Sequence, residues 1–186
     1  MTQLSDFSAD EIELLVSLPY RVGVWVSHAD DVEGEADDEH EMEALESCIR
    51  AVAKKYDGPG LVDDIARETL RRRDSWADWT DRAFNILPEA PRALSLLQSR
   101  AGRADAKNYK AALLEIAATV ARAYGEFGAF DEWENEGSGL FSALAGKIAG
   151  AFSSLSQDDK NHPMNISPAE NSAISRLAAA LKIDGP

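Results

Sequence analysis

The sequence predicts an all-α fold, a compact bundle of about seven to eight helices built as two pseudo-repeated halves. Apolar residues recur at helical spacing along most of the chain, and strictly alternating runs of β-branched residues are absent. Capping residues also precede several of the apolar segments. With 186 residues, 45% of them hydrophobic, the chain can bury a core of its own, so we expect a single domain over residues 1–186.

The first helix is predicted from Ser8, which forms a capping box with Glu11, to about His28. One apolar face is expected along it, made of Leu14, Leu15, Leu18, Val22, Trp25 and Val26. Pro19 interrupts this face. Because proline cannot donate to the carbonyl one turn earlier, the helix should bend or restart near Leu18.

The remaining helices follow from the same periodicity. They are expected over residues 38–56, 61–73, 76–87, from near Pro91 to Gly102, 106–127, and from Pro168 to about 183. Among their side chains we expect these to be core: Leu45, Cys48, Ile49, Trp76, Trp79 and Phe84. Solvated helix faces are expected to carry the acid-first pairs Asp63 with Arg67 and Glu68 with Arg72, and the arginine run 71–73.

The two ends of the chain show the same order: a long apolar helix, an acidic segment and a capped helix. The halves span about 8–73 and 104–183, with an insertion at about 133–165 in the second. Within the insertion, residues 140–155 are amphipathic. This stretch can fill the domain's own core, dock on a partner helix, cover the acidic segments or touch a membrane. Its one lysine, Lys147, disfavours the membrane.

This arrangement resembles the TerB-like family, named for the tellurite-resistance protein TerB. The family pattern is a helix that ends in Asp-Gly, a small hydrophobic residue, a cap, and Glu three positions later. The resemblance implies a bundle of pseudo-symmetric halves whose acidic loops gather into a divalent-metal site. It matches Asp31 and Asp131 to the loop aspartates and Glu170 to the glutamate of the capped helix. In the first half, His40 or Glu41 takes the glutamate position, depending on which residue is counted as the cap.

A metal site shared between the halves would draw on seven side chains: Asp31, Glu33, His40, Glu41, Asp131, Glu134 and Glu170. Such oxygen-rich ligands favour Ca²⁺ or Mg²⁺ over Zn²⁺. An EF-hand is excluded, because aligning Gly34 with the loop glycine places Ala29 and His40 at the first and twelfth ligand positions. The alternative is that these acids only complement the dipoles at helix N-termini, without a metal.

No catalytic constellation is recognisable, because the three histidines lack zinc-hydrolase spacing and Cys48 lies among apolar residues. The net charge of -14 disfavours nucleic acid and anionic membranes and favours cations or a basic protein partner. The lack of a secretory signal or a membrane-spanning stretch predicts a cytoplasmic protein. We therefore expect a non-enzymatic metal-binding sensor or adaptor in a bacterial stress or tellurite-type resistance system, or alternatively an interaction module without metal.

Overall fold

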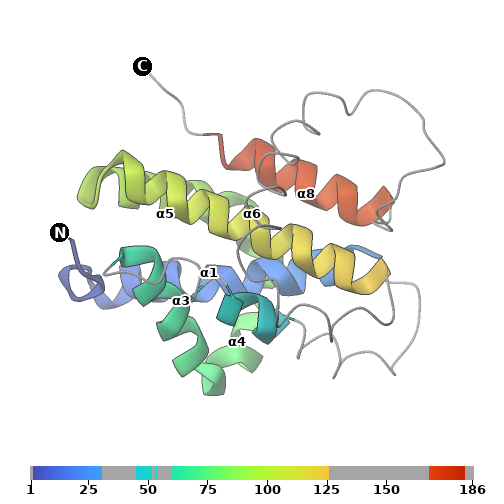
Figure 1. Ribbon diagram of the computed structural model, residues 1–186, viewed down its shortest axis with the longest axis horizontal. Helices are drawn as coiled ribbons and strands as arrows, with labels where there is room; N and C mark the ends of the chain where they lie inside the picture. Colours follow the sequence, from blue (N-terminus) through green and yellow to red (C-terminus); the bar gives the residue numbers. More distant parts are fainter. Residues whose placement is uncertain (1, 31–44, 52, 54–59, 126–167, 183–186) are drawn as a thin grey trace.

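The computed structural model describes residues 2–30, 45–51, 53, 60–125 and 168–182 (Figure 1). In these ranges the regular secondary structure is helical and no strand occurs, which confirms the all-α class. Residues from every described α-helix contribute to one hydrophobic cluster. The pseudo-repeat of the two halves stays a prediction.

Helix α1 (Ala9–Ser27) lies at the centre of the bundle. Its predicted capping box is confirmed, since the Ser8 hydroxyl accepts from the Glu11 amide at 3.3 Å and the Glu11 carboxylate accepts from the Ser8 amide at 2.8 Å. The prediction of a single inward face is wrong, because every residue from 15 to 26 is buried. The reason is tertiary: α1 is packed by α3 (Leu61–Arg71), α4 (Trp76–Thr80), α5 (Ile86–Arg100), α6 (Arg103–Gly125) and α8 (Pro168–Ala180).

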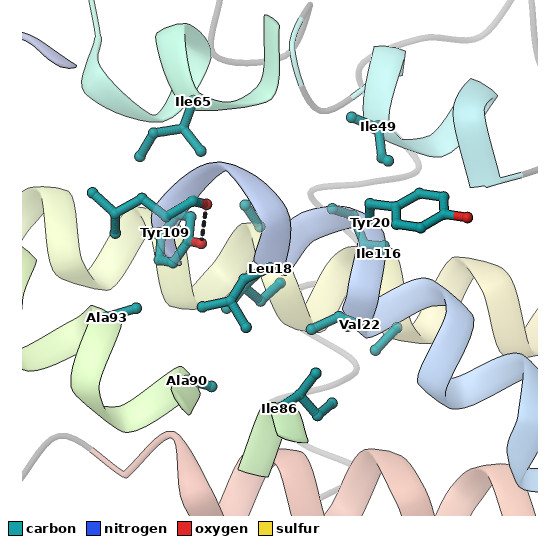
Figure 2. Close-up of a cluster of buried hydrophobic side chains, with 14 of the residues drawn as sticks. Leu18, Tyr20, Val22, Ile49, Ile65, Ile86, Ala90, Ala93, Tyr109 and Ile116 are labelled. Atoms are coloured by element: carbon teal, nitrogen blue, oxygen red, sulfur yellow. Dashed lines mark hydrogen bonds between the residues drawn. The ribbon is translucent and has the colours of Figure 1, made fainter. Parts of the chain in front are cut away.

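Pro19 does not restart α1, which continues as one helix through it. The proline frees the carbonyl of Leu15, four residues earlier, from its helical donor. The hydroxyl of Tyr109 on α6 donates to that carbonyl at 2.6 Å (the dashed line in Figure 2). The next carbonyl, of Val16, lies 2.7 Å from the hydroxyl of Thr69 on α3. Neighbouring helices therefore supply polar partners where the proline lies.

The segment between α3 and α6 departs from the predicted boundaries. The expected helix over 76–87 ends at Thr80, and a short 3-10 turn, η4 (Ala83–Asn85), precedes α5. Helix α5 begins at Ile86, before Pro91, and it tolerates Pro88 because that residue lies in the first turn, where no helical donor is needed. Gly102, with φ of 102°, ends α5 by donating to the Leu97 carbonyl at 2.9 Å.

Core predictions in this region are correct for the two tryptophans and wrong for Phe84. Trp76 and Trp79 are buried, whereas the Phe84 side chain is 67% exposed on η4. The prediction that Asp63 lies on a solvated face is also wrong. Asp63 is fully buried in the first turn of α3, and its carboxylate turns back toward Gly60, where a β-carbon would lie 3.3 Å away from it.

The arginine run 71–73 is tied into ion pairs that join several elements. Glu68 accepts from Arg71 and Arg72, each at 2.6 Å, which confirms the predicted pair of Glu68 with Arg72. Arg73 forms an ion pair with Glu46, which belongs to the helical residues 45–51. On α1, Glu13 accepts from three side chains: Arg72, which also donates to Glu68, at 3.2 Å, Trp79 at 2.7 Å and Arg82 at 2.7 Å.

The helical residues 45–51 pack against α1 and α6. Leu45 and Ile49 are buried, as predicted. A β-carbon on Gly23 would lie only 2.1 Å from Cδ1 of Leu45, so glycine permits a close approach to α1 one turn before that helix ends. Cys48 is buried as well, as predicted, and its thiol contacts the hydroxyl of Thr119 on α6.

Candidate functional site

One end of the bundle collects the described boundaries of both acidic segments. Helix α1 ends there in the 3-10 turn η2 (His28–Asp30), α6 ends there at Gly125, and α8 begins there at Pro168 (Figure 1). Helix α8 packs against η2, α6 and α1. Leu45, the residue that follows the segment 31–44, contacts Gly23 near the end of α1. Both flanks of that segment therefore lie near the end of α1. The topology thus anchors both segments to the same end of the fold.

The net negative charge of the chain is concentrated in two acidic segments, residues 30–43 and residues 126–136. Residues 30–43 contain nine carboxylates and no lysine or arginine, and residues 126–136 contain five carboxylates and again no base. The rest of the chain holds nineteen acidic and nineteen basic residues, so these two stretches account for the whole net charge of -14. A concentration of one sign of charge attracts cations and basic partners to that region.

Of the seven predicted ligands, only Glu170 falls within the described residues. It lies in the first turn of α8 and is 1% exposed. The other six lie outside the described residues: Asp31, Glu33, His40, Glu41, Asp131 and Glu134. Within the described ranges, no group of three or more His, Cys, Asp or Glu side chains is arranged to hold a metal ion. Whether the seven residues meet stays a prediction.

His28 is a candidate that the sequence reasoning missed. Its Nδ1 lies 2.8 Å from the Val24 carbonyl, which can only accept, so Nδ1 carries the proton of that hydrogen bond. His28 is exposed, and in the neutral ring its Nε2 is then an acceptor, able to bind a cation or a donor. The signal available in the sequence was a histidine at the end of a helix, directly before the run of acids that begins at Asp30.

The thiol of Cys48 is chemically quiet in this setting. Its pKa is raised to about 12, mainly by burial; the negative charge of Glu115 also raises it, and the hydrogen bond with Thr119 lowers it. A thiol with such a pKa stays protonated at neutral pH, and the thiolate is the form that attacks electrophiles or binds metals. Cys48 is therefore a core residue.

Comparison of the chain with protein-family models, with curated proteins and with solved structures gave no match. None of the described helices is both long and apolar enough to cross a membrane. The class that the structure defines is an all-α bundle, and in the sequence two acidic segments adjoin helices that end at one end of it.

Proposed function

We propose that the protein is a non-enzymatic helical domain that binds a divalent cation, Ca²⁺ or Mg²⁺ in preference to Zn²⁺, between its two acidic segments. The observation that carries the proposal is that the segments holding the whole net charge are anchored to one end of the bundle. Carboxylates held close together repel one another, and a hard cation relieves that repulsion. Asp31 and Asp131 are the central proposed ligands, with Glu33, His40 or Glu41, and Glu134 beside them.

Glu170 has a distinct place in the proposal. Its carboxylate is almost fully buried in the first turn of α8, the helix that packs against η2. A buried carboxylate retains its charge most easily near a positive group, and a helix N-terminus or a cation supplies one. In the metal-bound protein, Glu170 would link the bound cation to the position of α8.

If cation binding changes how α8 packs on the bundle, the change can be passed to a protein partner. Such coupling is what a sensor or adaptor needs. With the resemblance to the TerB-like family, we propose that the protein acts in the bacterial cytoplasm, in a stress or tellurite-type metal-resistance system. The alternative is an interaction module without metal. It is favoured by the position of Glu170, where the α8 dipole alone stabilises a carboxylate.

Thermal unfolding with and without cations tests the proposal. A ligand at 100 times its dissociation constant adds roughly 2.7 kcal/mol. In a chain of this size, this raises the Tm by about 5 to 10 °C, at about 2 to 4 °C per kcal/mol. The proposal expects Ca²⁺ or Mg²⁺ to give a saturable shift of this size, and Zn²⁺ to give less. Calorimetric titration gives the stoichiometry.

Matched variants separate a site from general screening. Asp31→Asn and Asp131→Asn should lose most of the cation-induced shift, while in chelator they should be neutral or slightly stabilising because carboxylate repulsion is relieved. Asp78→Asn, an exposed carboxylate on α4, is the control and should keep the full shift. A shift that is unsaturable, or equal in all variants, would leave the metal-free module as the better explanation.

A further inference from the structure

Phe84 is the one large apolar side chain that is exposed in the described part of the chain. It lies edge-on to the ring of His28, with ring centroids 6.0 Å apart and planes at 82°. The two rings come from different elements, η4 and η2, and form what we call the aromatic patch (Phe84 and His28). A single exposed apolar residue needs no explanation by itself. The rigid turn that holds this one, and the chain ends beside it, are what make it informative.

Buried groups on α1 fix the turn that carries Phe84. The guanidinium of Arg21, only 1% exposed, donates from Nε and Nη2 to the Arg82 carbonyl at 3.1 and 2.5 Å. Its Nη1 donates to the Glu89 carboxylate at 2.5 Å. Arg82 and Glu89 flank Phe84 in the chain, so one buried cation holds the chain on both sides of the exposed ring. A ring held in this way loses little conformational entropy when another group covers it.

The aromatic patch lies at the end of the bundle where the described chain stops after α6 and resumes at α8 (Figure 1). Helix α8 contacts η2, the turn that carries His28. Further along α8, the Arg176 guanidinium lies 5.9 Å from the ring centroid of Trp25, so α8 runs antiparallel to α1 and begins near the end of α1. Residues 126–167 therefore start and return at the end of the bundle that carries the patch.

The connection between α6 and α8 contains an apolar stretch, residues 140–155. Its large apolar residues recur at helical spacing: Leu140, Phe141, Leu144, Ile148, Phe152 and Leu155. Lys147 is the one charged residue between positions 137 and 155. The stretch can therefore cover an apolar surface with a single charge left to solvate.

The lengths of the flanking chain favour this stretch over a free partner. Residues 126–139 join it to α6, and residues 156–167 join it to α8. At ~3.3 Å per residue the shorter connection spans up to about 40 Å, more than the roughly 30 Å diameter of a small domain. A segment joined by such short linkers reaches an effective concentration of about millimolar. An apolar contact too weak to hold a free partner is therefore filled first by the segment of the same chain.

We propose that residues 140–155 dock on the aromatic patch of the same molecule, with their apolar side chains against the Phe84 ring. Such docking covers the exposed ring and attaches the connection between α6 and α8 to η2 and η4. The five carboxylates of residues 126–136 belong to the same connection, so docking also restricts where those acids lie. This inference goes beyond the proposed function and does not depend on a bound cation.

Hydrogen exchange of the full chain in chelator tests the inference, with mass spectrometry of peptides from residues 140–155 as the readout. We expect these amides to exchange at least about tenfold more slowly than in the isolated synthetic peptide of the same sequence. Phe84→Ser should accelerate their exchange by about tenfold, because one buried apolar contact is lost. Phe84→Leu should retain most of the protection, and Ala111→Ser, at an exposed position on α6, should retain all of it.

A change in the segment itself gives a second measurement. Leu144→Ser removes an apolar side chain from the stretch and leaves Phe84 in place, so it should accelerate the same amides. Combining it with Phe84→Ser should add little, because both changes break one contact. Circular dichroism of each variant checks that the fold is intact, and Leu144→Ser decides the question if Phe84→Ser alters the spectrum.

Three results would overturn the inference. Exchange of residues 140–155 as fast as in the free peptide would show that the segment does not dock. Protection that Phe84→Ser leaves unchanged would place the segment elsewhere, as in the domain's own core. Protection that falls on dilution, together with a dimer in sedimentation velocity, would identify a second copy of the chain as the source.

Discussion

Tyr109→Phe should destabilise the protein because Pro19 has left a carbonyl for the Tyr109 hydroxyl to serve. Tyr109 is almost fully buried on α6, and its hydroxyl donates to the Leu15 carbonyl at 2.6 Å. Since Pro19 has no N–H, the normal helical donor to that carbonyl does not exist. Phenylalanine keeps the ring but withdraws the donor, so a buried acceptor loses this bond.

The magnitude follows from the burial of that acceptor. Removing one partner of a buried hydrogen bond costs about 1 to 3 kcal/mol. In a chain of this size, each kcal/mol shifts the Tm by about 2 to 4 °C, so the Tm of Tyr109→Phe should fall by roughly 2 to 12 °C. Urea unfolding gives the free energy directly, and an unchanged m-value would show that the fold is unaltered.

A double-mutant cycle tests the role of the proline. In a Pro19→Ala background, the alanine N–H can donate to the Leu15 carbonyl. Tyr109→Phe should therefore destabilise that background by at least about 1 kcal/mol less than it destabilises the wild type. Thr119→Val, which removes another buried hydroxyl of α6, is the control and should cost the same in both backgrounds. If Tyr109→Phe costs the same with and without Pro19, the hydroxyl does not compensate for the proline and the reasoning fails.

Three further predictions follow from the packing and the ionisable groups. Gly23→Ala should cost about 1 to 3 kcal/mol, because the new β-carbon overlaps Leu45, and Leu45→Ala should relieve much of that penalty; additive costs in urea unfolding would contradict it. Burial would raise the pKa of Glu13, but its hydrogen bonds to Arg82 and Trp79 outweigh that effect and lower it. Its stabilisation is therefore present above the unfolded pKa of about 4.3 and lost as the pH falls through the lower folded value. Accordingly, Glu13→Gln should unfold at a lower temperature at pH 7 and show a smaller loss between pH 5 and 3, whereas an unchanged acid profile would refute it. The Cys48 thiol, with its pKa of about 12, should react with a thiol reagent at pH 8 far more slowly in the native than in the denatured protein, and rapid native reaction would show that the site opens.

The candidate site could be predicted only in part. The acidic segments and their anchoring helices are visible in the sequence, and the structure brings the described boundaries of those segments to one end of the bundle. Whether Asp31 approaches Asp131 depends on contacts between segments about one hundred residues apart, which local patterns do not report. His28 was missed although a local signal was available, a histidine at the end of a helix directly before the run of acids that begins at Asp30.

The sequence by itself determined the helical class, the start of α1 at the Ser8 cap, and the start of α8 near Pro168, because capping and periodicity act within a few residues. It also determined that Leu45, Ile49 and Cys48 are core. Only the tertiary structure decided that residues 15–26 of α1 are buried on all sides and that the helix passes through Pro19. It also decided that Asp63 is inside and Phe84 outside. Each of these outcomes depends on neighbouring helices, because burial and the pairing of freed polar groups are set by whatever packs alongside.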